Sequence, residues 1–555
     1  MNPKPTKMKL IIPVLLWQST TLYLKLLLAL TICFSINYTY GQSKKFTFKL
    51  GSEFSLPKKS DDLSFLGNEK NGIVNLSLKK DELYVSRFDP ATLELTKEKT
   101  IVLPELTKNF NSETVLDLGG NYFWLHSDWD KESEKEILYY DIVDVVNGQI
   151  NTANKKIIET SKIAGDLVSS GFYRAKTAGK YKFDLDAGKT RLLVSYRLKP
   201  EETNDKKNYD KIGIHVFDEK MNKLWGNEFT MPYTEAIMDN SDFSIDSKGN
   251  ANMLAKVYDS EKRREIDKET GKAGYHYEVL KFIKDNKQIM HTTISIDDYF
   301  IKEASLVENS IHEMVIACTY SKKAKRGGTD GIFLAMMDAR GKINKYKNGY
   351  YEFPLAELEK YESERTKRKM ERKDDYETPN LKVRNVLVES DGSIFIVGEV
   401  YYVVTNTYTS STGATQVSYT YYYEDIIGTK INAAGNVEWV RKIPKQQRGG
   451  NGQGTMGFKL ISDDTGYSFL FLDNKKNMEL KEDEAPKYHI DGFGGQVVVA
   501  HADNSGMITK EIVFDTREED IMIFPSRFSK INSNQFIGRV KIKKGEYKPL
   551  LITVK

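Results

Sequence analysis

A hairpin of two short apolar strands recurs along this 555-residue chain and limits the folds open to it. In its clearest copy, Lys211–Met231, apolar residues alternate with small or polar ones from Ile212 onward. This period of two predicts a strand with one apolar face. Asp218–Asn222 supplies turn-forming residues, and Leu224–Phe229 has the composition of a returning strand. The stretch is therefore a predicted β-hairpin.

Two patterns built from such strands repeat with drifting sequence. The hairpin recurs at six more places, with Asp, Asn or Gly in the turns: Val85–Leu95, Val143–Ile150, Phe282–Ile289, Met336–Ile343, Ile431–Trp439 and Val499–Ile508. A polar turn leading into an apolar strand occurs at eight places: Asn71–Leu78, Gly119–Leu125, Gly188–Tyr196, Asp246–Val257, Asn309–Tyr320, Asp391–Val400, Asp464–Leu472 and Asn534–Ile542. These turn residues accept the backbone angles that tight turns need.

The alternation of the two patterns predicts units of about four short strands, which is typical of an all-β fold of the β-propeller type. The last unit, Arg527–Lys555, has only three predicted strands. Phe46–Leu50 alternates like a strand and can supply the fourth, which closes the ring and removes an open sheet edge. We therefore expect an eight-bladed propeller. Seven blades is the alternative, because the first two units match the pattern least well.

The first 41 residues differ from the rest. Three lysines precede the apolar runs Leu10–Trp17 and Leu22–Ile36, and T-Y-G-Q-S follows at 39–43. This order predicts an export signal peptide over residues 1–41, cleaved after Gly41. An uncleaved anchor is the alternative. Lipidation at Cys33 is disfavoured, because Ile32 stands where a small residue is needed.

Residues 42–555 are expected to form one domain. The signal holds four lysines and no acidic residue, which leaves 78 of the 82 basic residues to balance 78 acidic ones. The balance gives no support for nucleic-acid binding. Cys318 is then the one remaining cysteine, so no internal disulfide can form. No apolar run beyond the signal is long enough to span a bilayer.

The long segments of the chain are predicted to gather on one face of the propeller. The turns of both repeated patterns are short and share one face, whereas the other connections lie on the opposite face. The long ones include Lys199–Lys211, Asp259–Ala273, Lys322–Asp330, Asn474–Gly494 and Tyr401–Asp425. Long loops on a rigid scaffold commonly carry binding sites.

Two of the long segments have a predicted structure of their own. Residues 401–425 alternate up to a Ser-Ser-Thr-Gly tip, which predicts a projecting β-hairpin. Residues 355–377 are rich in helix formers and follow Pro354, which predicts a helical insertion seated through Leu355, Leu358 and Tyr361. The rest of that helix is expected to be a solvated charged surface.

Tyrosines crowd the predicted hairpin, and these are the candidate binding residues: Tyr401, Tyr402, Tyr408, Tyr419, Tyr421, Tyr422 and Tyr423. Exposed tyrosine is favoured at protein interfaces and on sugar-binding surfaces. Cross-strand tyrosine pairs also stabilise a hairpin without any ligand. Both interpretations remain open from the sequence.

No catalytic, cofactor-binding or metal-binding motif is identified. Gly452–Gly457 matches G-x-G-x-x-G, but no strand precedes it and a predicted strand, not a helix, follows it. The seven histidines are scattered without metal-ligand spacing, and His312 begins a zinc-protease pattern that Ile316 breaks. His215 is expected to be a core or edge residue.

A glycan-active hydrolase is the alternative from another class of function. Propeller glycosidases place carboxylates near the axis. The acids predicted at or near the innermost strands are Glu113 or Asp117, Asp239, Asp242 and Glu303. Acids in solvated turns or strand ends explain the same residues.

With its signal, the T-Y-G-Q junction and degenerate turn–strand repeats, the chain resembles secreted or envelope β-propeller proteins of the Bacteroidota type. The resemblance implies export to the periplasm or the cell surface, in association with the outer membrane. We expect a non-catalytic binding or assembly module whose partner is an envelope or surface protein, with a glycan as the alternative. No family's functional residues are carried over.

Overall fold

The computed structural model of the protein describes residues 45–555, apart from 104–105, 108, 165, 170–174, 202–204, 285–286, 297–298, 310–311, 324–327, 339, 373–375, 410–414, 451–454, 491–493, 533 and 544. The predicted signal peptide 1–41 lies outside the described residues, as do the tip of the predicted hairpin and the Asp285-Asn286 turn. Within the described part the chain is nearly all-β.

Among the described residues, eight sheets follow one another along the chain, and each is built on four antiparallel strands. The first sheet contains β3 (Asp61–Asn68), β4 (Gly72–Lys79), β5 (Glu82–Phe88) and β6 (Leu95–Val102), and the second contains β7 (Asn111–Leu118), β8 (Asn121–Asp130), β9 (Lys135–Asp144) and β10 (Gln149–Thr160). The third contains β14 (Tyr181–Leu185), β15 (Arg191–Leu198), β16 (Tyr209–Asp218) and β17 (Lys223–Thr234). The fourth contains β18 (Met238–Ile245), β19 (Ala251–Tyr258), β20 (Tyr275–Phe282) and β21 (Ile289–Ile294).

The next three sheets are β22 (Phe300–Glu308), β23 (Met314–Ser321), β25 (Gly331–Met337) and β26 (Ile343–Glu352); β28 (Leu381–Val388), β29 (Ile394–Thr409), β30 (Thr415–Ile431) and β31 (Val437–Ile443); and β33 (Lys459–Asp463), β34 (Gly466–Asp473), β36 (Gln496–Asp503) and β37 (Ile508–Asp515). The eighth contains β38 (Ser529–Lys530), β39 (Gln535–Lys543), β40 (Glu546–Val554) and, from the other end of the chain, β1 (Phe46–Leu50).

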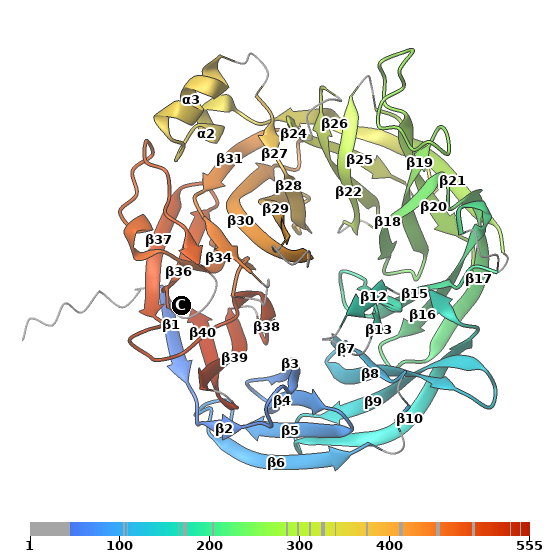
Figure 1. Cartoon of the computed structure of the whole chain (residues 1–555), viewed down its shortest axis with the longest axis vertical. Helices are drawn as coiled ribbons and strands as arrows, with labels where there is room; N and C mark the ends of the chain where they lie inside the picture. Colours follow the sequence, from blue (N-terminus) through green and yellow to red (C-terminus); the bar gives the residue numbers. More distant parts are fainter. Residues whose placement is uncertain are drawn as a thin grey trace, which may run out of the picture.

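The eight sheets stand around a common centre (Figure 1). The first strand of a sheet, such as β3, β7, β18 or β22, lies nearest the centre, and the last, such as β6, β10, β17 or β21, lies outermost. Each of the eight predicted turn–strand patterns overlaps the second strand of a sheet, and each of the seven predicted hairpins joins the last two strands. Both patterns are therefore confirmed.

Additional short strands occupy the connections. They are β2 (Phe54–Ser55), β11 (Ile163–Ala164), β12 (Asp166–Ser169), β13 (Ala175–Ala178), β24 (Gly328–Thr329), β27 (Thr378–Pro379), β32 (Gln447–Gly449) and β35 (His489–Ile490). The described connections also contain the single 3-10 turns η1 (Asp205–Lys207), η2 (Lys475–Asn477) and η3 (Pro525–Arg527).

The core lies between the sheets, because the central strands are buried on both faces. In β34, Phe469 and Phe471 pack against the sixth sheet, while Leu470 and Leu472 pack against the eighth. Such strands have continuous apolar runs instead of simple alternation. Eight apolar clusters among the described residues each join two neighbouring sheets, and one of them joins the eighth sheet to the first.

A five-residue turn recurs between strands. In Asp246–Asn250, the first carboxylate accepts the backbone N–H groups of Lys248 and Asn250 at 3.0 and 2.8 Å, and Gly249 takes a φ of +81°. The same bonds form in Asp218–Asn222, where Met221 takes the left-handed position with a φ of +62°. Asp and Asn favour such turns because their side chains bond the following backbone.

The two ends of the described chain meet in one sheet. β1 pairs antiparallel with β40, from Phe46 opposite Val554 to Leu50 opposite Leu550. Phe46 is 2% exposed and lies in the apolar cluster shared by the seventh and eighth sheets. The predicted pairing of Phe46–Leu50 with the C-terminal strands is therefore confirmed.

The predicted helical insertion differs in detail from a single helix. It contains two short helices, α2 (Leu355–Leu358) and α3 (Glu364–Glu371), separated where Tyr361 takes a left-handed φ of +60°. Ser363 begins α3 because its side chain accepts the N–H of Thr366, a standard N-cap. Leu358 is buried as expected, but Leu355 is exposed, and Met370 supplies the second buried contact.

In the part of the chain that the structure describes, no helix combines the length and apolar character needed to cross a membrane.

Replacing Phe46 by Ala is expected to destabilise the protein by about 3–5 kcal/mol, the usual cost of emptying a buried aromatic site. The loss should appear as a lower midpoint of urea unfolding. Thr47→Ala, at the half-buried neighbouring position, is the matched control and should change the midpoint little. Equal effects of the two changes would show that β1 does not complete the core of the last sheet.

Candidate functional site

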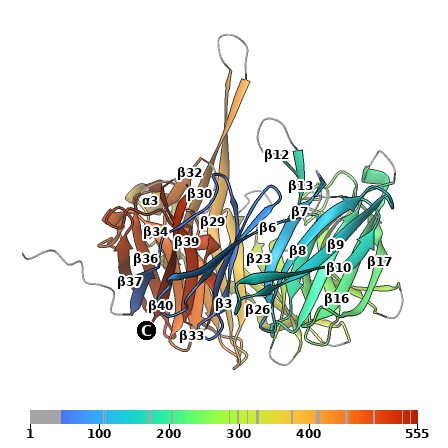
Figure 2. The ribbon, with the colours of Figure 1, turned by 90° about the horizontal axis from the view of Figure 1, so that it is seen from below.

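The sixth sheet carries a two-stranded ribbon that projects far beyond the other strands (Figure 2). Its register runs from Tyr401 opposite Tyr423 to Thr409 opposite Thr415. We call Tyr401–Thr409 and Thr415–Tyr423 the projecting ribbon. β28 pairs with β29 only as far as Val400, and β32 pairs with β30 only at its last three ribbon residues. Beyond these points neither edge has a strand partner among the described residues.

The projecting ribbon is uncharged in a chain of which 29% is charged. Positions 401–423 hold no Asp, Glu, Lys, Arg or His, and no Pro. Five of its large apolar or aromatic residues are exposed: Val403, Val404, Tyr408, Val417 and Tyr419. Charges and prolines are the usual means of keeping a free strand edge from pairing with other chains. The ribbon lacks both.

The seven predicted binding tyrosines fall into two groups. At the base, Tyr402 and Tyr422 stack at 4.6 Å between ring centroids, and Tyr401 and Tyr423 lie at 4.8 Å. Tyr421, opposite Val403, is half-buried. Tyr408 and Tyr419 are 68% and 50% exposed. The basal pairs therefore stiffen the ribbon, and the two distal tyrosines are the ones open to a partner.

The base of the projecting ribbon rests on a buried ion pair. The Lys445 side chain is 0% exposed, and its ammonium lies 2.8 Å from a carboxylate oxygen of Glu399, which is also buried. The other carboxylate oxygen accepts from Arg384 Nε at 2.9 Å. Lys445 also donates to the backbone carbonyl of Tyr423 at 3.1 Å. A buried charge needs such partners, because an unpaired one is costly in a low dielectric.

A second buried lysine fixes the helical insertion to the same base. Lys442 Nζ lies 3.2 Å from Asp425 and donates to Glu362 at 2.6 Å. Its backbone N–H donates to Glu357 of α2 at 2.9 Å. Burial lowers the pKa of Lys442, but the two carboxylates outweigh burial and raise it above its usual value. The lysine therefore stays charged and holds α2 against β31.

The long connection of the seventh sheet joins this base as well. Tyr488 donates to Glu424 at 2.7 Å, and Tyr402 donates to the same carboxylate at 2.9 Å. β35 adds in parallel to β32, with His489 opposite Gln447. The N–H of Tyr361, after α2, donates to the carbonyl of Glu482 at 2.7 Å. The hairpin 401–425, the insertion 355–377 and the loop 474–494 thus form one connected surface.

The basal tyrosines are held neutral. Burial, followed by the nearby Glu424 carboxylate, raises the pKa of both Tyr402 and Tyr488 well above the usual value. Burial also lowers the pKa of His489 to about 4, since its ring is desolvated and Lys445 lies nearby. Because the Tyr402 and Tyr488 hydroxyls stay neutral, both can donate a hydrogen bond to Glu424. These two bonds hold the base of the ribbon to the loop 474–494.

The acids predicted near the axis each have a structural partner. Asp242 of β18 accepts from Ser305 Oγ at 2.9 Å and Leu306 N at 3.0 Å, both on β22. Glu303 of β22 in turn accepts from Val383 N of β28 at 2.9 Å and pairs with Lys382. These carboxylates join the innermost strands of successive sheets.

The other predicted acids are likewise engaged. Glu113 accepts from Ser127 Oγ at 2.6 Å, and burial raises its pKa. Asp117 pairs with Lys189, and Asp239 with Arg263. The sequence did not single out Asp184, whose pKa burial and Asp242 raise to about 7.

One described group brings together a serine, a histidine and a glutamate, but not in the geometry of a catalytic triad. Ser247 Oγ and Glu308 both approach the same nitrogen of His312, Nδ1, at 2.7 and 2.9 Å. A nucleophile relay needs serine and carboxylate on opposite ring nitrogens. Within the described residues, no three His, Cys, Asp or Glu side chains are placed to hold a metal ion.

Three further predictions can be compared with the described residues. His215 is buried in the third sheet, with Nε2 at 3.0 Å from the Tyr196 hydroxyl. Cys318 is buried and unpaired. Gly457 is followed by the strand β33, and the residues 452–454 of the glycine motif lie outside the described part.

The buried pairs at the base were not identified from the sequence. Glu399 interrupts the apolar run Ile394–Val400, and Lys445 follows a buried strand. A charged residue in or next to an apolar segment was the one sequence feature that could have indicated a buried ion pair. That signal gives no partner, because charged residues also interrupt strands at solvent-facing positions.

No protein-family model matches the chain, and no curated protein matches it significantly. Among solved structures, the Dos1 propeller is 10% identical over 91% of this chain and 95% of its own, with a TM-score of 0.39. An uncharacterized protein from Listeria monocytogenes EGD-e is 8% identical over 79% and 92%, with a TM-score of 0.37. Pyrococcus horikoshii acylaminoacyl peptidase is 9% identical over 88% of this chain and 57% of its own, with a TM-score of 0.33. These values are too low to carry a conclusion about this chain.

Lys445→Met is expected to destabilise the protein by about 3–5 kcal/mol, because it removes one of the two counter-charges of the buried Glu399 and leaves only Arg384. The double variant Lys445→Met/Glu399→Gln also removes the charge of the Glu399 carboxylate and should recover part of the lost unfolding free energy. Urea unfolding of the wild type and the variants measures both effects. The single variant Glu399→Gln completes the comparison. If the double variant loses more unfolding free energy than the two single variants together, Lys445 and Glu399 do not form a compensated ion pair.

Lowering the pH from 7 to 5 is expected to cost about 2 kcal/mol of stability through His489. Its folded pKa of about 4 lies below the unfolded value, so only the unfolded chain gains a proton as the pH falls toward 5. His489→Gln cannot take up that proton. The stability difference between the wild type and His489→Gln, from urea unfolding at both pH values, should shift by this amount, whereas a constant difference would contradict it.

Proposed function

We propose that residues 42–555 form one eight-bladed β-propeller domain whose ring is closed by the N-terminal strand. The eight successive four-stranded sheets support the blade count over the seven-bladed alternative. The apolar cluster between the eighth sheet and the first supports closure, as does the pairing of β1 with β40. A closed ring leaves no sheet with an unpacked face.

We further propose that this propeller is a non-catalytic binding or assembly module at the cell envelope. The observation that carries the proposal is the projecting ribbon, an uncharged and exposed pair of strand edges on a firmly anchored base. An exposed, uncharged edge invites pairing with another chain. The long-loop side, which holds the insertion 355–377 and the loop 474–494, completes the contact surface.

The binding mode that fits the ribbon is strand addition. An extended segment of an envelope or surface protein would pair along Tyr402–Thr409 of β29, and the exposed Tyr408 and Tyr419 would pack on its side chains. In this mode backbone hydrogen bonds give affinity and alternate side chains give specificity. β32 already adds to β30 at the base in the same way. The partner needs no complementary charge, because the ribbon presents none.

The proposed location rests on the N-terminal sequence. Residues 1–41 have the order of an export signal, which would deliver the chain to the periplasm or the cell surface, in association with the outer membrane. The hydrolase alternative is less well supported, since Glu113, Asp117, Asp239, Asp242 and Glu303 each bond to a protein partner.

Capture from native cells tests the proposal. Residues 405–419 are replaced by Asn-Gly, which closes a two-residue turn between the paired Val404 and Thr420 and keeps both basal tyrosine pairs. After crosslinking, the full-length protein should capture a specific envelope protein that the shortened protein does not.

Charge variants of full length control for the shortening. Val404→Lys/Tyr408→Lys and Val403→Lys/Val417→Lys each place lysines on one face of the projecting ribbon, and lysine on an edge opposes strand pairing. Capture should fall at least tenfold in one or both, with unfolding midpoints unchanged. Identical capture by the full-length and shortened proteins would falsify the ribbon as the binding element.

A further inference from the structure

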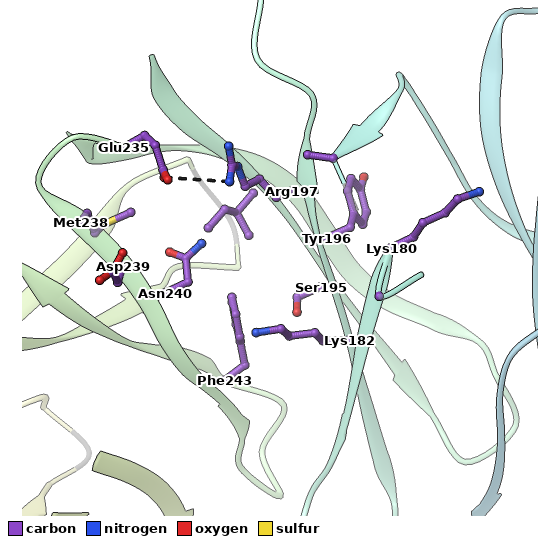
Figure 3. A pocket seen from close by; sticks show the side chains of 13 residues that line it. Lys180, Lys182, Ser195, Tyr196, Arg197, Glu235, Met238, Asp239, Asn240 and Phe243 are labelled. Carbon is purple, nitrogen blue, oxygen red and sulfur yellow. Dashed lines mark ion pairs between the residues drawn. The ribbon is translucent and has the colours of Figure 1, made fainter. Parts of the chain in front are cut away.

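A polar cavity lies between the third and fourth sheets, apart from the projecting ribbon (Figure 3). Its volume is about 300 Å³, and it is lined by residues near the start of β14 and β16, near the end of β15 and along β18. These strand ends meet the long connections. A cavity of this size is at the lower end of ligand pockets and fits a small molecule.

Most charges in the lining are compensated within the protein. The Arg197 guanidinium lies 2.8 Å from the Asp210 carboxylate and 3.9 Å from the Glu235 carboxylate. The dashed line in Figure 3 marks the pair of Arg197 with Glu235. Lys180 is buried and donates to Glu136 at 2.6 Å. Asp239 pairs with Arg263. These groups have little charge to offer a ligand.

Three polar groups of the lining remain available. Ser195 is 1% exposed, and its hydroxyl has no hydrogen-bond partner. The side-chain carbonyl of Asn240 is buried and also lacks a partner. Lys182, the cross-strand partner of Ser195, is exposed and has no ion pair with a described carboxylate, although it is within electrostatic reach of Asp184 and Asp242. An unpaired buried polar group is costly, so a bound ligand that pairs it gains affinity.

An apolar wall completes the cavity. The Phe243 ring is 7% exposed and lies 5.2 Å from the Lys182 ammonium. Figure 3 shows the Lys182 side chain extending toward this ring, with Ser195 and Asn240 nearby. A ligand therefore meets a cation, two oxygen acceptors and a flat apolar surface within one small space.

We propose that this cavity binds a small hydroxylated carboxylate, no larger than one sugar residue. The carboxylate would face Lys182, hydroxyl groups would donate to Asn240 Oδ1 and Ser195 Oγ, and the C–H face of the molecule would lie on Phe243. Sugar acids and short hydroxy acids both have this chemistry. The site is separate from the projecting ribbon and does not rest on its proposed function.

Titration calorimetry of the mature protein with D-glucuronate, D-glucose and L-lactate tests the proposal. Glucuronate or lactate should bind at least tenfold more tightly than glucose, because only the acids engage Lys182 with a charge. Preference for glucuronate assigns the site to sugar acids, and preference for lactate assigns it to short hydroxy acids. Absence of binding by both acids, or equal affinity for glucose and glucuronate, overturns the proposal.

Variants locate the binding. Lys182→Met and Asn240→Leu should each weaken binding of the preferred acid about tenfold or more. Lys220→Met removes an exposed lysine from a turn at the other end of the third sheet and should leave affinity unchanged. The shortened-ribbon protein should bind the acid as well as the full-length chain does. An acid that binds equally to Lys182→Met, with the fold intact, does not occupy this cavity, and the proposal fails.

Discussion

Burial of the central strands on both faces is the constraint on which this structure depends. A strand such as β34 gives its odd and even residues to two different sheet interfaces, with Phe469 on one side and Leu470 on the other. A sheet with two apolar faces needs a neighbour on each side. The first sheet meets this need through the eighth, and the eighth obtains its outer strand from Phe46–Leu50. Ring order and the meeting of the chain ends thus have one cause.

The rigid scaffold also explains how the projecting ribbon can exist. A two-stranded ribbon is marginally stable by itself in water. Here its strands continue from β29 and β30, whose lower halves are buried, and its base is held by Glu399, Lys445 and Lys442. Buried ion pairs add little net stability over an apolar core, but removing one partner leaves an uncompensated charge and is costly. These pairs therefore hold the base of the ribbon to the neighbouring strands.

The carboxylates near the centre show how position decides the role of a residue. Asp242 and Glu303 stand where an axial active site would place its acids, and the sequence marked both. Each instead accepts a backbone N–H from the innermost strand of the next sheet. The residue type and its strand were predictable because both follow from local pattern. The bonded partner was not, because it lies on another sheet brought close only by the ring.

The sequence by itself indicated the strands and the turns, because strand periodicity and the backbone angles of Asp, Asn and Gly are local properties. It left the number of repeats open between eight and seven. It also identified the segment 401–425 and its tyrosines. Only the tertiary structure decided which tyrosines pair at the base and which remain exposed, since the pairing depends on register. It alone joined Lys445 to Glu399, Lys442 to Glu357, and Ser195 and Asn240 across one cavity. These contacts link residues from different strands or sheets, and neither composition nor spacing along the chain specifies which surfaces the fold brings together.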